Sequence, residues 1–221
     1  MTTTVYEWRV AAGTVELRAK DDEEGRWAVG HGAVFEVPTE IYGITEIVEK
    51  GAFAKTIKEA DVRGLFNHDP NRLIGTTSAG TLTLREDPDG LWYEDDLPDT
   101  PTGNEVRTLL GRKDLKGSSI GFRTIVDLWT EKKDGTIERR IKEVALRDTG
   151  PVTFPAYDAT DAALRSLAEF RAVSFDTALE AAHKGELGRL FSPRGGERTS
   201  TTSEVESRES TFVPHRSWMF A

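Results

Sequence analysis

The chain contains no cysteine. This absence excludes disulfide bonds, thiolate zinc sites and a cysteine nucleophile, and it suits a reducing cytoplasm. Long apolar runs are also missing, because none approaches the ~20 residues that a membrane-spanning helix needs. Residues 1–12 have no basic segment followed by an apolar stretch. We therefore expect neither a secretory signal there nor a membrane partner for the protein.

Positive charge is in deficit. The 29 Lys and Arg residues against 38 Asp and Glu residues give a net charge of −9 at pH 7. A protein that coats nucleic acid needs a positive surface that neutralises phosphates and releases their counterions. The charge balance therefore argues against direct binding of nucleic acid.

The length of 221 residues suits one substantial domain with flexible ends. We expect a flexible leader over residues 1–12, one domain over residues 13–190 and a disordered tail over residues 191–221. Ser, Thr, Glu and Arg dominate the tail, and residues 192–210 contain one large apolar side chain, Val205. One such side chain is too few to bury a core, which predicts disorder.

Apolar and polar residues alternate over much of the chain, which predicts mostly strands with helices inserted and appended. A short hairpin is expected across Asp87-Pro88-Asp89-Gly90, and a long two-strand ribbon around the Asp134-Gly135 turn. The other predicted strands cover 15–19, 27–35 and 62–66, and the predicted helices cover 51–60, 103–112, 160–172 and 175–190. This pattern predicts an α+β fold, a mostly antiparallel β-barrel surrounded by helices.

Three segments carry side chains suited to hydrolysis. In Leu-Phe-Asn-His-Asp-Pro, His68 follows an apolar run. In Leu-Lys-Gly-Ser-Ser-Ile-Gly-Phe, Ser119 lies between two glycines, and in Leu-Arg-Asp-Thr-Gly-Pro, Asp148 precedes a Gly-Pro turn. A histidine base, a serine nucleophile and an acid that orients the base are the parts of a serine hydrolase.

Each segment alone also fits a plainer interpretation. Gly117 to Gly121 matches the pattern G-x-S-x-G, but a strand pattern follows it, whereas the nucleophile elbow of α/β-hydrolases requires a helix. A polar start to a strand fits these residues as well. His68 fits a simple turn closed by Asn67 or Asp69, and a lone histidine is a poor metal site.

The acidic residues also have a plainer interpretation, as solvated carboxylates. Asp148 fits a carboxylate at a strand end, and Glu143 fits the charged face of its strand. A further acidic cluster fits a wet surface or a weak cation site: Glu94, Asp95, Asp96 and Asp99.

Taken together, the segments resemble the tailed-bacteriophage prohead protease family, the serine proteases that mature phage capsids. The resemblance covers roughly residues 14–170 and runs through blocks in the family's order: 48–53, 65–70 with 73–75, 90–92 with 97–100, 115–122 and 151–157. It implies a herpesvirus-assemblin-like fold, a β-barrel wrapped by helices. It also implies that His68 and Ser119 are catalytic, with Ser118 at the variable position before the nucleophile.

The third catalytic residue implied by the resemblance is Asp148. The family usually has a Glu followed by Val-Ser-Pro-Val-Thr, where this chain has Asp148 and then Thr-Gly-Pro-Val-Thr. Aspartate keeps the charge on a shorter side chain, and the next candidates for the role are Glu143 and Asp69. The implied oxyanion donors are backbone N–H groups near Gly121 and Phe122, which Arg123 or Arg147 could assist.

The function that the resemblance implies is a serine endopeptidase without a cofactor. It would cleave extensions of the scaffold and the major capsid protein, and also itself, inside the assembling procapsid in the host cytoplasm. Coat and scaffold subunits are the implied partners, and the resemblance leaves room for a homodimer. The alternative is an inactive assembly or scaffolding protein that keeps the fold. Short apolar pieces at 212–214 and 218–220 would dock the tail on coat or scaffold subunits.

Overall fold

The computed structural model describes residues 7–20, 23–154, 159–191 and 205–209. Its strands are β1 (Glu7–Lys20), β2 (Glu23–Val34), β3 (Thr39–Ile41), β4 (Ile44–Val48), β5 (Arg63–Leu65), β6 (Leu73–Thr76), β7 (Leu82–Glu86), β8 (Gly90–Asp96), β9 (Gly117–Glu131), β10 (Ile137–Val152) and β11 (Val205–Glu209). Its helices are α1 (Thr56–Glu59), α2 (Pro101–Gly111), α3 (Ala159–Phe170) and α4 (Phe175–His183), with 3-10 turns η1 (Phe66–His68) and η2 (Leu187–Leu190). The α+β class predicted from the sequence is confirmed.

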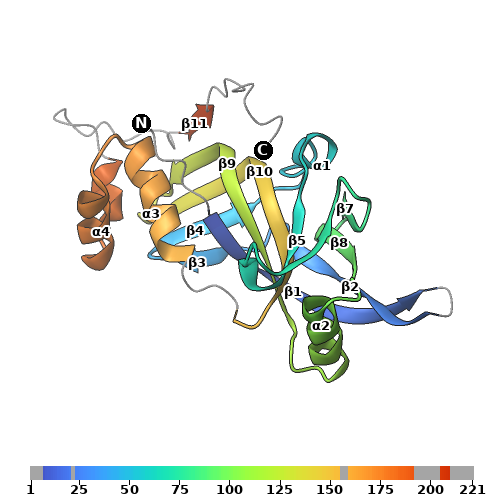
Figure 1. Cartoon of the computed structure of the whole chain (residues 1–221). Helices are drawn as coiled ribbons and strands as arrows, with labels where there is room; N and C mark the ends of the chain where they lie inside the picture. Colours follow the sequence, from blue (N-terminus) through green and yellow to red (C-terminus); the bar gives the residue numbers. More distant parts are fainter. Residues whose placement is uncertain (1–6, 21–22, 155–158, 192–204, 210–221) are drawn as a thin grey trace.

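Hydrogen bonds join the strands in the order β3-β4-β10-β9-β1-β2-β8-β7 (Figure 1). The strands β9 and β10 form the predicted long ribbon, and the turn between them holds Gly135 at φ 85°. Most neighbours are antiparallel, but β10 takes two parallel neighbours in succession. It pairs with β4 over Ile137–Ile141 and with β5 at Asp148 and Thr149.

The predicted barrel is wrong as a closed structure. In the part of the chain that the structure describes, β3 and β7 end the strand order and do not pair with each other. Three register shifts interrupt the pairing of β9 with β10, and β10 exchanges β4 for β5 along its length. Such irregularities bend a strand and increase its twist, so the sheet divides at β10 instead of closing.

Two hydrophobic cores lie along the ribbon. The first core fills the space between β2, β8, β9, β10 and α2, and includes Phe53, Phe66, Leu91, Tyr93 and Phe122. The second core packs α3, α4 and η2 on Ile41, Ile44, Trp129 and Ile137. Figure 1 shows α3 and α4 together at one end of the strands and α2 at the other. No helix of the described residues is long and apolar enough to cross a membrane.

Both ends of the predicted domain differ from the structure. Strand β1 begins at Glu7, so part of the predicted leader over residues 1–12 is a strand. In the predicted tail over 191–221, residues 205–209 form β11, which pairs with Val126–Thr130 of β9. The tail residues 192–204 and 210–221 lie outside the described residues, as do residues 1–6 of the leader.

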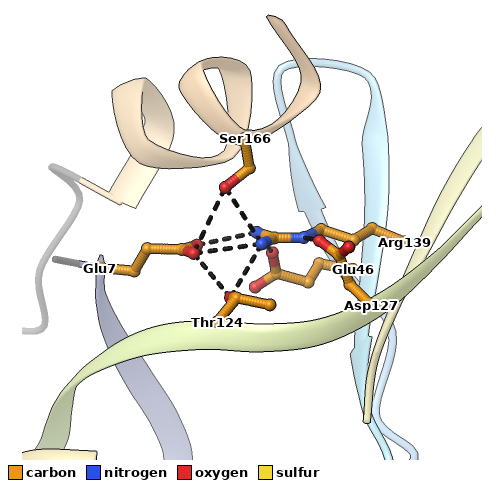
Figure 2. A network of polar contacts seen from close by, with 6 residues as sticks. All are labelled: Glu7, Glu46, Thr124, Asp127, Arg139 and Ser166. Atoms are coloured by element: carbon orange, nitrogen blue, oxygen red, sulfur yellow. Dashed lines mark hydrogen bonds and ion pairs between the residues drawn. The ribbon is translucent and has the colours of Figure 1, made fainter. Parts of the chain in front are cut away.

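A buried ion network includes Glu7, the first residue of β1 (Figure 2). Arg139 of β10 has no exposed surface, and its guanidinium donates to Glu7 (2.7 Å), Glu46 (2.9 Å) and Asp127 (2.9 Å). Burial lowers the pKa of Arg139, but the three carboxylates raise it more, and the net pKa lies well above its usual value. The network therefore ties β1, β4 and β9 to β10.

Two hydroxyls complete this network. Arg139 also donates to Thr124 of β9 at 2.9 Å and to Ser166 of α3 at 3.1 Å. Figure 2 shows Ser166 reaching down from its helix toward the guanidinium. Because Ser166 lies on α3, the network also fixes that helix against the sheet.

Candidate active site

Ser119 lies inside the sheet, on a strand that is paired on both sides. Its backbone is opposite Val10 of β1 and Gly150 of β10. Successive side chains of a strand point to opposite faces, so Ser118 and Ser119 point apart. Ser118 Oγ donates to Tyr93 Oη at 3.1 Å in the core. Ser119 Oγ instead lies 2.7 Å from Nε2 of His68.

His68 is held at the end of the turn η1, which follows β5 directly. The two ring nitrogens face different partners, since Nε2 faces Ser119 and Nδ1 makes a short contact with Oδ1 of Asp148. A carboxylate at Nδ1 fixes the tautomer that carries its proton there, which leaves Nε2 free to accept a proton. The structure therefore brings together the three residues that the sequence singled out.

Asp148 reaches His68 because the neighbouring strand offers a glycine. Asp148 lies on β10 opposite Gly121 of β9, and its side chain is 3% exposed. A Cβ on Gly121 would lie 2.4 Å from Asp148 Oδ2, closer than any real contact allows. The second glycine of the Gly-x-Ser-x-Gly block thus makes room for the acid.

The three side chains are nearly closed off from solvent. Ser119 has no exposed surface, and the His68 side chain is 14% exposed. A base hydrogen-bonded to a hydroxyl and oriented by an acid can remove the hydroxyl proton during attack on a carbonyl. In this conformation Ser119 Oγ is closed to a substrate.

The predicted oxyanion donors near Gly121 and Phe122 are poorly placed. Both residues lie in β9 where β1 pairs on one side and β10 on the other. Backbone N–H groups of such a strand serve the ladders on either side, so they do not face a substrate. The irregularity beside them falls between Leu146 and Asp148, where Arg147 lies.

The alternative acids lie elsewhere. Asp69 Oδ1 accepts from the backbone N–H and the side-chain amide of Asn71 at 2.9 and 3.0 Å, which closes its own turn. Glu143 accepts from Lys55 Nζ at 3.1 Å at the surface. Neither carboxylate faces His68 in these contacts, whereas Asp148 contacts its Nδ1.

The acidic cluster at the end of β8 is the wet surface that the sequence suggested except at Asp95. Asp96 pairs with Arg26 at the surface, but Asp95 has no exposed surface. Neither carboxylate oxygen of Asp95 has a hydrogen-bond partner among the described residues. A Cβ on Gly64 or on Gly75 would lie within 2.0 Å of these oxygens, so the two glycines provide the space for the acid.

Burial, followed by the charge of Asp96, raises the pKa of Asp95 to about 8. The acid lies against β5 and β6, the hairpin that carries His68 at its end. At neutral pH it is therefore a neutral acid in the core behind the site. The alternation on β8 is the sequence signal for this burial, because Asp95 takes the inward position that Leu91 and Tyr93 take before it.

We expect Asp95→Asn to flatten the dependence of stability on pH. The folded-state pKa of Asp95 lies above its usual 3.8, so its contribution is complete below pH 3.8 and is lost as the pH rises through about 8. Between these values the free energy of unfolding falls by about 1.4 kcal/mol per pH unit through this group. Urea unfolding of both proteins at several pH values between about 5.5 and 8.5 measures the two slopes of stability against pH. Parallel curves would contradict the assignment of a neutral Asp95.

Among the described residues, one group of three side chains has the spacing of metal ligands. The ligand atoms of His31, Asp87 and Asp89 lie within 4.8 Å of one another. However, Asp87 Oδ1 already accepts the backbone N–H groups of Asp89 and Gly90, and its Oδ2 lies 3.0 Å from His31 Nε2. These contacts close the turn between β7 and β8, so they account for the cluster without an ion.

One family model matches most of the chain. The family model described as "Caudovirus prohead serine protease" matches residues 13–173, a range that includes His68, Ser119 and Asp148. Among solved structures, the bacteriophage T4 capsid assembly protease, gp21, is similar with a TM-score of 0.44 and 11% identity, over 68% of this chain and 97% of that chain. No curated protein matches the chain.

Proposed function

Because the chain belongs to the caudovirus prohead serine protease family, we propose that it is an active serine endopeptidase. Its substrates are extensions of the scaffold and the major capsid protein, which it cleaves inside the assembling procapsid in the host cytoplasm. One observation carries the proposal: Ser119 Oγ lies 2.7 Å from His68 Nε2, while Asp148 contacts the opposite ring nitrogen. This is the geometry that base-activated attack on an amide requires.

In the proposed mechanism, His68 Nε2 accepts the hydroxyl proton as Ser119 Oγ bonds to the scissile carbonyl carbon. The negative charge of Asp148 stabilises the imidazolium that forms. Collapse of the tetrahedral adduct breaks the C–N bond, and His68 returns the proton to the leaving amine. Water then repeats the two steps and releases the acyl group. Arg147 and Arg123 are the proposed sources of oxyanion stabilisation.

The alternative function, an inactive assembly protein that keeps the fold, draws on the complete burial of Ser119. A fluorophosphonate probe separates the two functions, because it phosphonylates only an activated serine. We expect labelling of the full chain, with the adduct on the peptide that contains Ser119, and none in Ser119→Ala. Absence of labelling in the unmodified protein, at long times and elevated temperature, would favour the inactive protein.

The acid should contribute less than the base or the nucleophile. We expect Asp148→Asn to lower the rate of probe labelling by about 10²- to 10⁴-fold, because the wrong tautomer of His68 becomes available and the imidazolium loses its counter-charge. The fold should persist, since asparagine has the same shape. Glu143→Gln is the matched control on the same strand and should change the rate little. Full activity in Asp148→Asn would remove it from the mechanism.

We also propose that the protease cleaves itself near its tail and that the tail docks on coat or scaffold subunits. The composition of residues 192–210 supports this. Segments of small and polar residues, with few apolar side chains to bury, are preferred sites of proteolytic cleavage. Mass spectrometry of the protein aged alone, beside Ser119→Ala, tests self-cleavage. A tail that stays intact in the active protein would rule this step out. We further propose that the protein forms a homodimer. Light scattering, which measures the molar mass in solution, tests this.

A further inference from the structure

The turn that carries His68 has an unusual backbone. Asn67 and the histidine itself both have φ 56°, in the left-handed region. Residues with a Cβ rarely adopt this region, and two in succession persist only where surrounding contacts enforce them. Asparagine tolerates the region better than most residues. The question is which contacts hold the turn in this form.

Two of the neighbouring residues are fixed within the turn or beneath it. Phe66 is buried in the first core, and its N–H donates to the carbonyl of Arg72 at 3.1 Å. Asp69 binds Asn71, and its N–H donates to the carbonyl of Phe66 at 3.2 Å. These contacts close the turn on itself, but they do not connect it to the strand that carries Asp148.

Asn67 makes that connection with both ends of its amide. Its Oδ1 accepts the backbone N–H of Thr153 at 2.7 Å, and its Nδ2 donates to Thr153 Oγ1 at 3.2 Å. Thr153 follows directly on the last residue of β10, the strand that also carries Asp148 and pairs with Ser119. We call this pair of hydrogen bonds the Asn67–Thr153 clasp.

We infer that Asn67 is a positioning residue whose clasp sets the angle of the His68 ring. The ring must meet Ser119 with one nitrogen and Asp148 with the other, and both of these partners belong to the β9–β10 ribbon. The clasp fixes the residue before His68 to the same ribbon. The predicted effect of the clasp on the reaction rate rests on the proposed function. Its predicted effect on the orientation of the His68 ring does not.

A simpler role for Asn67 would be to suit the left-handed backbone, with the hydrogen bonds incidental. Glycine separates the two roles, because it adopts the left-handed region freely but has no side chain to form the clasp. Alanine at the same position loses both properties. Aspartate keeps the shape, and its two oxygens can accept from the N–H and the hydroxyl of Thr153.

The experiment measures the rate constant of fluorophosphonate labelling for the full chain with Asn67→Gly, Asn67→Ala, Asn67→Asp and Thr153→Val. We expect Asn67→Gly and Asn67→Ala to lose roughly ten- to hundred-fold, because small misplacement of a catalytic group costs about that much. Thr153→Val keeps the hydrogen bond from the backbone N–H of residue 153 to Asn67 Oδ1, so its labelling rate should fall less. Asn67→Asp should recover most of the rate, with its pH profile moved upward by the added charge near His68.

A second readout does not depend on catalysis. A histidine Nδ1 proton bonded to a carboxylate gives a low-field proton resonance, and we expect this signal in the unmodified protein and its loss in Asn67→Gly. The melting temperature should stay the same, because Asn67 and Thr153 are exposed. An Asn67→Gly variant with the rate and resonance of the unmodified protein would overturn the clasp. If the unmodified protein shows the resonance but no labelling, the proposed function is overturned, and loss of the resonance in Asn67→Gly would still support the clasp.

Discussion

Replacement of Ser119 or of His68 by alanine should abolish cleavage of the coat precursor, while Ser118→Ala should leave most of it. Loss of the nucleophile or the base of such a triad typically lowers the rate by about 10³- to 10⁶-fold. Ser118 is the matched control because it lies next to Ser119 on β9 but faces Tyr93 in the core. Its replacement removes the neutral hydrogen bonds of the Ser118 hydroxyl to Tyr93 and to the carbonyl of Gly150, each worth about 1 kcal/mol of stability.

The measurement is the appearance of shortened coat and scaffold proteins when each variant is mixed with its own phage's precursors. Circular dichroism and a thermal melt confirm that each variant is folded. An inactive Ser118→Ala with an active Ser119→Ala would mean that the two faces of β9 are inverted. Activity in both serine variants would mean that the site lies elsewhere on the chain.

The second large effect concerns stability. Arg139→Met should lower the free energy of unfolding by about 3–5 kcal/mol, because it leaves Glu7, Glu46 and Asp127 buried without a counter-charge. Such a loss is a large fraction of the roughly 5–15 kcal/mol that holds a typical domain together. Urea unfolding measures it, and failure to obtain soluble protein is the extreme form of the same result.

The matched control is the next residue along the strand. Arg140 points to the other face of β10 and pairs with Glu36 at 2.6 Å and Glu49 at 2.5 Å near the surface. Surface pairs contribute about 0–1 kcal/mol, so Arg140→Met should cost little. Equal losses in the two variants would contradict the role of the buried network. Addition of Glu7→Gln to Arg139→Met should recover part of the stability, because one uncompensated charge is removed.

Local signals explain what could be predicted from the sequence. The Asp134-Gly135 turn and the alternation on either side define the β9–β10 ribbon without help from distant residues. The same alternation places Ser118 and Ser119 on opposite faces. The candidate residues could be singled out for a second reason. His68 and Ser119 fall in blocks that resemble a known family in its order, and Asp148 lies shortly before another such block.

Non-local pairing explains what could not be predicted. The parallel neighbours of β10 come from segments far away in the sequence, and nothing in β10 marks where one replaces the other. Charged residues were the other difficulty. Arg139 belongs to a stretch of mixed charge and Asp95 to an acidic cluster, and both stretches resemble a solvated face. The burial of Arg139 depends on Glu7 and Glu46, and that of Asp95 on two glycines of other strands. Sequence periodicity shows which face a residue takes but not what covers it.

The burial of Ser119 has a consequence for the kinetics of the reaction. Suppose that a reagent contacts the hydroxyl only after a conformational change exposes it. The observed rate then rises with reagent concentration until it equals the rate constant of that conformational change, and it stays constant at higher concentrations. The plateau should be the same for chemically different reagents and should rise steeply with temperature. If the proposed function holds and the protease is enclosed with its substrates, such a delay would separate the time at which the shell is built from the time at which its subunits are cut.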